Sequence, residues 1–282
     1  MKKLPRNSGQ ALLVVLLIMA VALTIGLAVT SRTVTDVEIS EQSEEAARAF
    51  SAAEAGIEEA LITAELEPLT GSFQEGEVSY RTTPSPLGNT NQYLFPKSDS
   101  EVRTLWLANY SDLSSSYTED SLILFWGNSD STEEPALEIA VYYQTGSDYK
   151  VLRYALDPID RGDNFCLPGD DPGIPRCENV IDFEVGPFSI AGASAKYQAS
   201  LDLSPATGTL LFARLRLLYS DELDQIIAAQ AAGSTIFPSQ GVRISSVGTA
   251  GGSTRKIEVV RLHPAPPGIF DFLLYSEGDL VK

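Results

Sequence analysis

The feature that most constrains the fold is an unbroken run of apolar residues near the start of the chain. Residues 11–29 read ALLVVLLIMAVALTIGLAV and carry no formal charge. A helix of that length matches the hydrocarbon core of a bilayer, which is about 30 Å thick. Basic residues precede the run and acidic residues follow it, so the positive-inside rule predicts a cytoplasmic N-terminus and an exported remainder. The basic residues are Lys2, Lys3 and Arg6, and the first acidic ones are Asp36, Glu38 and Glu41.

Three kinds of N-terminal segment would use such a run, and the residues alone leave them open. A secretory signal peptide could be cut after Ala20-Val21-Ala22, an A-x-A site, although the apolar run continues beyond it to Val29. An uncleaved signal anchor needs no further feature. A short basic leader, cut on the cytoplasmic side of the helix just after a glycine, would be removed after Gly9, where glycine supplies a flexible backbone.

The residues beyond the apolar run predict that the helix continues without a break. Ser31 to Glu67 contains no proline and a single glycine, Gly56, and Pro68 then ends the helix because proline disfavours helical geometry in the residue before it. We therefore predict a helix from Gln10 to Glu67, about 85 Å long. An apolar stripe, mostly of alanine, runs along its second half, and acidic residues lie largely off it. The stripe comprises Ala46, Phe50, Ala53, Ile57, Ala60 and Ala64.

A stalk or a dimeric coiled coil is the plain alternative for this second half. Its stripe spans only about three heptads and is rich in alanine, which makes a poor leucine-type seam. Small side chains instead allow a close approach to a sheet or to neighbouring helices. The pattern therefore favours a helix with one half in lipid and one half packed against protein.

After Pro68 the apolar residues alternate with polar ones, and β-branched and aromatic residues become frequent, which indicates strands. Turn residues at 145–148 and 250–253 predict two hairpins. We expect residues 68–282 to form a mainly antiparallel β domain packed on the polar half of the helix, so the fold class is α+β. A split near 160–175 into two subdomains stays open. The predicted strands are 121–127, 136–144, 149–156, 195–203, 209–220, 241–247 and 255–263, followed by a further apolar segment within 264–279.

The charge and the residue content argue against two classes of function. A formal net charge of −18 disfavours nucleic acid as a direct partner, because non-specific affinity for phosphate backbones depends on Lys and Arg. His263 is the only histidine, and the chain has no G-x-S-x-G motif, no phosphate-binding loop and no G-x-G-x-x-G. We therefore expect no enzymatic activity and no cofactor.

The two cysteines, Cys166 and Cys177, stand eleven positions apart around several prolines and glycines. A zinc site would need more Cys or His, and a redox pair would need C-x-x-C. A disulfide and a pair of buried free thiols both remain open. The disulfide is favoured if the domain lies outside the cytoplasm.

Charged residues elsewhere form three patterns of low specificity. Acidic residues flank the cysteine loop without the ligand spacing of a calcium loop, so we expect a solvated loop and no metal. Arg161-Gly162-Asp163 is an RGD tripeptide, and a match of three residues is expected by chance. Basic residues gather on the C-terminal strands, either to balance the acidic helix or to form a subunit interface. The acidic residues are Asp157, Asp160, Asp163, Asp170 and Asp171, and the basic ones are Arg214, Arg216, Arg243, Arg255, Lys256 and Arg261.

Two separate motifs in the helix carry a resemblance to a known family. SGQALLVVLLIMAVALTIGLAVTSRTV (8–34) and EEAARAFSAAEAGIEEAL (44–61) resemble the N-terminus of type IV minor pilins and pseudopilins, especially PilX-type pilus assembly proteins. The resemblance implies a pilin-like fold, a leader of residues 1–9, cleavage between Gly9 and Gln10, and N-methylation of Gln10. It also implies withdrawal from the cytoplasmic membrane into an extracellular filament. The implied partners are other pilin subunits, a prepilin peptidase, an inner-membrane assembly platform and membrane lipid.

One residue departs from the family pattern. Major pilins carry a glutamate at the fifth mature position, whereas counting from Gln10 places Val14 there. A carboxylate within the membrane is costly unless it is paired, so this chain lacks one assembly contact, which suits a minor subunit. The resemblance places the assembly face on Phe50, Ala53, Glu54 and Ile57, together with Val14. The alternatives are a single-pass surface protein whose β domain binds a ligand or another cell and, third, an anchored extracellular hydrolase.

Overall fold

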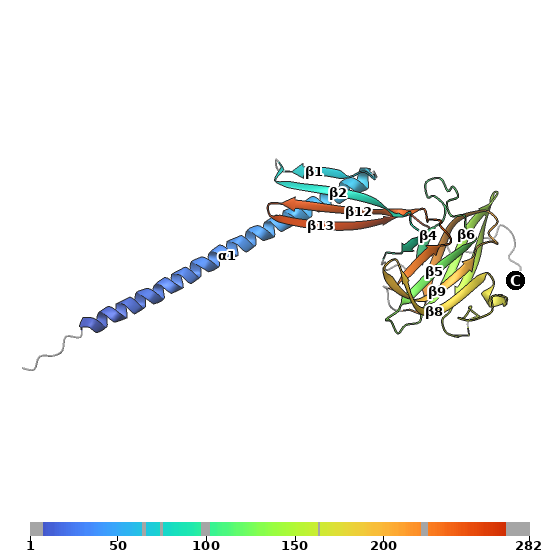
Figure 1. Ribbon diagram of the computed structural model, residues 1–282. Helices are drawn as coiled ribbons and strands as arrows, with labels where there is room; N and C mark the ends of the chain where they lie inside the picture. Colours follow the sequence, from blue (N-terminus) through green and yellow to red (C-terminus); the bar gives the residue numbers. More distant parts are fainter. Residues whose placement is uncertain are drawn as a thin grey trace, which may run out of the picture. The chain divides into compact units, whose positions relative to one another are not determined.

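The structure is a computed structural model that describes residues 8–63, 66–73, 76–96, 102–162, 164–220 and 225–268. The chain divides into two compact units. The first comprises Met1–Pro84 and Ile244–Val259, and the second comprises Ser85–Arg243 and Val260–Lys282. One long apolar helix is followed by mainly antiparallel β structure, so the expected α+β class is confirmed at that level (Figure 1).

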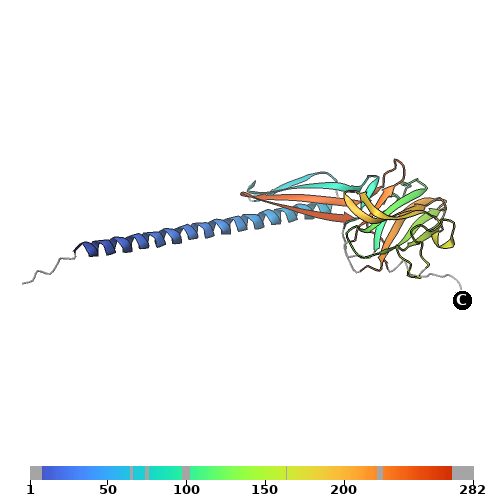
Figure 2. The same cartoon turned by 60° about the horizontal axis from the view of Figure 1, so that its bottom comes forward.

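The helix α1 runs unbroken from Ser8 to Thr63, over 56 residues (Figure 2). It begins two residues before the predicted start at Gln10, since neither Ser8 nor Gly9 prevents helical geometry. It also stops short of the predicted end at Glu67, because Leu66 and Glu67 lie in a bend ahead of Pro68. Residues 64–65 and the leader segment 1–7 lie outside the described part of the chain.

The second half of α1 packs against the four-stranded sheet of the first unit. This sheet has the order β1-β2-β12-β13, and its outer strands are β1 (Leu69–Phe73) and β13 (Ser253–Leu262). Its inner strands are β2 (Val78–Gly88) and β12 (Ser239–Ala250), both of which continue into the second unit. The helix residues buried on this sheet are Ala49, Ala52, Ala53, Gly56, Ile57 and Ala60.

The predicted apolar stripe was right at Ala53, Ile57 and Ala60 and wrong at Phe50, whose side chain is 47% exposed. The reason is the closeness of the packing. A Cβ atom on Gly248 of β12 would overlap the carbonyl oxygen of Ala49, so helix and strand meet backbone to backbone. A phenyl ring has no room in such a contact, and Phe50 lies beside it instead. Ala64, the last residue of the predicted stripe, lies outside the described residues.

A glycine on the helix makes a similarly close contact with the sheet. A Cβ on Gly56 would overlap the hydroxyl oxygens of Thr82 and Ser246. These two hydroxyl groups are fully buried, and Thr82 donates a hydrogen bond of 3.0 Å to Ser246, so neither is left without a partner. Small residues on both elements therefore allow helix and sheet to touch.

The second unit is built from two sheets that share one core. The first has the order β4-β10-β6-β7 and the second the order β3-β11-β5-β9-β8. Buried residues of both sheets form a single cluster that includes Trp126, the largest fully buried side chain, whose Nε1 donates to the Pro135 carbonyl oxygen at 2.8 Å. Two sheets with a common core make a β-sandwich. The strands are β3 (Gln92–Leu94), β4 (Val102–Trp106), β5 (Ser121–Asn128), β6 (Ala136–Thr145), β7 (Asp148–Leu156), β8 (Val180–Ile190), β9 (Ala193–Asp202), β10 (Thr209–Leu218) and β11 (Ile227–Ala231).

Each predicted strand that ends before residue 264 is present, as β5, β6, β7, β9, β10, β12 and β13, and both predicted hairpins join neighbouring strands. The strands β1, β2, β3, β4, β8 and β11 were not predicted. The apolar segment expected within 264–279 lies mostly outside the described residues. The division between units does not fall near 160–175, because β9 and β10, which follow that stretch, pair with β5, β4 and β6, which precede it.

Replacing Gly248 with alanine tests the close packing. The added methyl group would overlap backbone atoms of Ala49 and Ala53, which cannot yield without shifting the helix. We expect the free energy of unfolding to fall by about 1–3 kcal/mol. Denaturant unfolding of the detergent-solubilised protein, followed by its helical circular dichroism signal, measures the change.

Gly252→Ala is the matched control in the neighbouring hairpin. A Cβ there would meet Glu45 Oε2 at an ordinary 3.6 Å, so the change should stay within about 0.5 kcal/mol. Equal effects of the two substitutions would contradict the backbone contact.

Candidate functional site

The first half of α1 presents apolar side chains on all sides. From Leu12 to Val29 the large apolar residues are exposed, and within the described residues this is one helix long and apolar enough to cross a membrane. Its few hydroxyl groups bond back to the helix, as Thr24 Oγ1 does to the Val21 carbonyl oxygen at 2.8 Å. Such bonding suits a medium that offers no water, because each polar group must find its partner within the helix.

The second half of α1 is held to its sheet by two carboxylates as well as by small residues. Glu45 Oε2 accepts a hydrogen bond of 3.0 Å from the Gly252 N–H in the turn between β12 and β13. Tyr80 of β2 donates its phenolic hydrogen to Glu59. This bond, with smaller contributions from burial and from the charge of Glu59, raises the pKa of Tyr80. The helix is thereby attached to the inner strand β2 and to the turn that joins β12 to β13.

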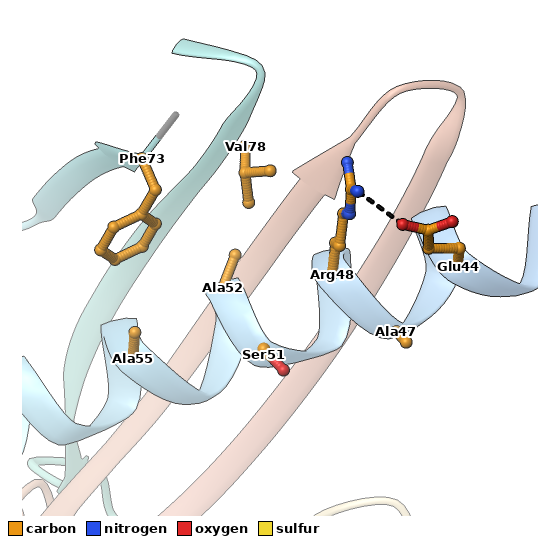
Figure 3. Close-up of a pocket in the computed structure, with 8 residues that line it drawn as sticks. All are labelled: Glu44, Ala47, Arg48, Ser51, Ala52, Ala55, Phe73 and Val78. Carbon is orange, nitrogen blue, oxygen red and sulfur yellow. Dashed lines mark hydrogen bonds and ion pairs between the residues drawn. The ribbon is translucent and has the colours of Figure 1, made fainter. Parts of the chain in front are cut away.

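A groove follows the outward side of this half of the helix (Figure 3). Its volume is about 540 Å³. Ala47, Ser51 and Ala55, four residues apart, form a floor of small side chains, and Phe73 of β1 forms one wall with its side chain 46% exposed. The other lining residues are Ala52, Val78 and the ion pair of Glu44 with Arg48. The groove can accept an apolar side chain or the edge of another helix.

The structure separates the five predicted assembly residues into two groups. Val14, Phe50 and Glu54 are exposed, whereas Ala53 and Ile57 are buried against the sheet of their own unit. Only the exposed group can contact another subunit while this packing is intact. Gly9 and Gln10 lie in the first turn of α1, with side chains outside the described set.

The groove was not predicted from the amino-acid sequence. Phe73 belongs to a five-residue strand that contains a glycine, and this gives no alternation to detect. The four-residue spacing of Ala47, Ser51 and Ala55 is visible in the sequence, but it does not reveal which strand covers their flank.

Cys166 and Cys177 form a disulfide, with their Cα atoms 4.8 Å apart, so the alternative of two free thiols was wrong. The bond closes a loop at the end of β7. Cys166 N–H donates to the Ala155 carbonyl oxygen, and Asp157 N–H donates to the Cys166 carbonyl oxygen, each at 2.9 Å. The loop is therefore attached to the strand as well as closed on itself.

The acidic residues around this loop bond to neighbouring groups. Asp157 is fully buried and pairs with Arg161, whose guanidinium also donates to the Glu134 carbonyl oxygen at 2.7 Å and lies over the ring of Tyr219. The RGD arginine is therefore engaged within the fold, and Asp163 lies outside the described residues.

One described group of potential metal ligands comes together, formed by Cys166, Asp170 and Cys177. Both sulfur atoms are used by the disulfide, and Arg176 pairs with Asp170 at 2.7 Å. The Arg176 guanidinium already neutralises the Asp170 carboxylate, so this group of three residues does not suit a metal ion.

The remaining candidates are scattered. His263 follows β13, and its ring stacks on that of Tyr110 with the ring centroids 4.5 Å apart. Burial is the main cause that lowers the pKa of His263, and the positive charge of Arg261 adds to the lowering. Arg214 and Arg216 share a face of β10 as predicted and belong to the second unit, whereas α1 belongs to the first. Arg214 donates a hydrogen bond to the Pro266 carbonyl oxygen. These residues do not converge on one site.

Compared with known proteins, the chain matches no protein-family model, no curated protein and no solved structure. Function must therefore be inferred from the chain's own residues and geometry. The features of the first unit that stand out are the exposed apolar half of α1, the groove beside its second half, and the exposed ring of Phe50.

The Asp170–Arg176 pair makes the disulfide loop sensitive to acid. The hydrogen bond from Arg176 lowers the pKa of Asp170 most, burial opposes it, and the Leu167 N–H adds to the lowering. A lowered pKa means that the folded state holds this proton less tightly than the unfolded state, whose aspartates titrate near pH 3.9. The stabilisation is therefore complete above that pH and is lost as the pH falls through the lowered pKa.

We expect Asp170→Asn to have a lower Tm than the wild type at pH 7 and a shrinking deficit as the pH falls below about 4. Thermal unfolding across this range measures the difference. Asp182→Asn, on the exposed side of β8, removes the same formal charge and should show no comparable deficit. A deficit for Asp170→Asn that stays constant with pH would contradict the role of the ion pair.

Proposed function

We propose that the chain is a non-enzymatic minor pilin or pseudopilin-like subunit of a type IV pilus-like filament, acting in its initiation, at its tip or as decoration. One observation supports this most directly. The single helix α1 has an exposed apolar first half and a second half that small residues bind closely to its own sheet. A plain anchor needs only the first half. A helix that continues into a folded unit can leave the membrane with that unit and pack beside other helices.

The outward side of the second half offers places for such packing. The groove beside Ala47, Ser51 and Ala55 has a floor of small residues that would let another helix approach closely. Phe50 exposes a large ring one helical turn from Ala47 and Glu54, beside the small residues of the groove. Large aromatic side chains are enriched among the residues that carry binding energy at interfaces, so a partner helix could cover this ring.

In this proposal the newly made protein is first inserted in the cytoplasmic membrane with a short cytoplasmic N-terminus. A prepilin peptidase cuts after Gly9 and Gln10 is methylated, and an inner-membrane assembly platform then passes the subunit to a filament on the cell surface. Val14 at the fifth mature position supports a minor subunit, because the chain lacks the glutamate that would pair with a neighbour's N-terminal amine.

A single-pass surface protein with a ligand-binding β domain is the second candidate. It is favoured by a pocket of about 700 Å³ beside the disulfide loop, lined by Ile174, Pro175, Val180, Ile181 and Asp202 among others. In that case the helix would stay in the membrane, and its N-terminus would remain uncut.

The N-terminus of the native protein separates the two candidates. We expect mass spectrometry of protein from its native membrane to find a mature chain that begins at N-methylated Gln10. Gly9→Val should block the cut and leave a chain that begins at Met1, because a β-branched residue replaces the small one at the cleavage site. Gly26→Val, a glycine with nothing within 4 Å of its Cβ position, should be processed normally.

A native chain that begins at Met1 or at Leu23 would refute the pilin proposal. An intact Met1 would indicate the uncleaved anchor, and a start at Leu23 would indicate a secretory signal peptide cut after Ala22.

Phe50→Ser tests the outward face of the helix. We expect its recovery in filaments sheared from cells to fall roughly tenfold, which corresponds to about 1.4 kcal/mol of lost contact. The fold should be unaffected, because the ring is not part of the buried helix–sheet contact. Quantitative blotting of the filament fraction against the membrane fraction measures the effect.

Ile236→Ser is the control, since Ile236 is similarly exposed but belongs to the second unit. Its recovery should match the wild type. Unchanged recovery of Phe50→Ser would remove this residue from the assembly face.

A further inference from the structure

A pocket of about 700 Å³ lies beside the disulfide loop, and every residue that lines it belongs to the second unit. This volume is in the range of pockets that hold small ligands. The loop supplies one side, and the chain around the start of β8 and the end of β9 supplies the other. The lining residues are Pro172, Gly173, Ile174 and Pro175 from the loop, and Glu178, Asn179, Val180, Ile181 and Asp202.

Both sides of the pocket are partly apolar, and a β-bulge provides the exposed side chain on the strand side. Val180 pairs with Leu201 and Asp182 pairs with Ser200, so Ile181 is an extra residue in β8. A bulge of this kind redirects a side chain, and that of Ile181 is 49% exposed. The prolines and Ile174 of the loop supply the other apolar side. An aliphatic chain would therefore be covered from both sides of the pocket.

The Asp202 carboxylate in this pocket is held in place by bonds to its own residue. The Asp202 N–H donates to the Asn179 carbonyl oxygen at 2.8 Å, and the Asp202 carbonyl oxygen accepts from the Tyr154 hydroxyl at 2.7 Å. The side-chain Oδ1 accepts from the Ser204 N–H at 2.9 Å. The second oxygen, Oδ2, has no hydrogen-bond partner among the described residues. One carboxylate oxygen is therefore positioned in advance for a ligand, which lowers the cost of ordering it on binding.

A second carboxylate, that of Glu178, lines the same pocket. Glu178 is exposed, and within the described part of the chain its carboxylate forms no hydrogen bond or ion pair. Arg176, the basic residue of the loop, pairs with Asp170 at 2.7 Å. None of the described residues that line the pocket is a lysine or an arginine. The pocket therefore places two negative charges beside apolar sides, with no cation of its own.

The loop side of the pocket depends on the disulfide. The bond between Cys166 and Cys177 closes the loop, and successive backbone bonds fold it. The Cys177 N–H donates to the Ile174 carbonyl oxygen at 3.0 Å, and the Ile174 N–H donates to the Asp171 carbonyl oxygen at 3.1 Å. Ile174 is thus fixed between the two turns. Reduction of the disulfide would release this side of the pocket and leave the strand side in place.

We propose that this pocket binds a lysine side chain of a partner protein. The four-carbon stem of lysine lies between Ile174 and Ile181, and its ammonium group meets the carboxylates of Asp202 and Glu178. Lysine suits the pocket because it joins a long apolar stem to a compact charge with three donors. A second copy of this chain is disfavoured as the partner, since each copy carries a formal charge of −18. The site can serve a filament subunit or an anchored surface protein, so it does not depend on the proposed function.

A fluorescein-labelled peptide, Ala-Val-Lys-Val-Ala, tests the proposal against the full-length, disulfide-bonded protein in a neutral detergent. The matched peptide carries norleucine, which keeps the stem and removes the charge. We expect fluorescence polarisation to show about tenfold tighter binding of the lysine peptide, because hydrogen bonds to charged groups are the stronger ones. Its affinity should fall as salt screens the carboxylates. Reduction of the disulfide should weaken the binding, because it releases the loop side of the pocket.

Asp202→Asn should weaken the lysine peptide about tenfold and leave the norleucine peptide unchanged. Glu178→Gln should cause a smaller loss and, because Glu178 is exposed, tests the site even if Asp202→Asn fails to fold. Asp182→Asn is the matched control, since Asp182 follows Ile181 but does not line the pocket. It should bind as the wild type does.

Four results would overturn the proposal. They are equal affinity for the two peptides, equal effects of Asp202→Asn and Asp182→Asn, full binding after reduction, and displacement of the peptide by calcium at constant ionic strength. The last result would indicate a metal ion as the ligand, although calcium requires more oxygen ligands than two carboxylates supply.

Discussion

The backbone of α1 touches the backbone of β12, and the rest of the first unit depends on this contact. Gly248 leaves room for the Ala49 carbonyl, and Gly56 leaves room for the hydroxyl groups of Thr82 and Ser246. Such closeness excludes large side chains from the interface. The larger apolar groups nearby, Phe50 and Phe73, are therefore exposed beside it. The same packing that fixes the helix thus creates the outward groove and the exposed ring that are available to a partner.

The extent of this contact also determines which part of the helix is left without protein cover. The sheet ends its cover near Glu45, and the helix continues toward its N-terminus with no protein around it in the described residues. Each large apolar side chain from Leu12 to Val29 would gain about 1.5–3 kcal/mol on leaving water. Lipid can supply that cover, and in the proposed filament the helices of neighbouring subunits would supply it. The proposed transfer from membrane to filament would use the rigid connection that α1 provides.

Much of the fold could be predicted from periodicity. The absence of proline between Arg6 and Glu67 predicts the long helix, and regular alternation predicts strands such as β6 and β7. The missed strands lack that signal. β2 contains Pro84 and Pro86, and β11 reads IAAQA, in which alanine carries little strand preference. These strands form because they pair with strands from elsewhere in the chain, although their own sequences show little strand preference.

The candidate site was harder to predict because its geometry depends on both the helix and the strands that pack against it. Helical periodicity located the apolar side of α1 but included Phe50 in it, since the shapes of β2 and β12 decide that Ala49 and Gly56 are the residues that fit. The disulfide shows the same limit. The spacing of Cys166 and Cys177 left free thiols open, because it does not reveal the successive turns, such as those closed by the Asp170 and Cys177 N–H groups, that fold the loop back on itself.

A cysteine scan along α1 in the native membrane tests most directly whether one helix joins a lipid half to a docked half. Single cysteines from Leu12 to Thr63 would be treated with a membrane-impermeant thiol reagent applied to both sides of the membrane. The account predicts no labelling from Leu12 to Val29 and labelling at every position from Ser31 to Glu44. From Glu45 to Thr63 it predicts a helical period, with Ala49, Ala53 and Ala60 protected and Ala47, Ser51 and Glu54 labelled. Labelling throughout the first half, or labelling without a period in the second, would contradict it.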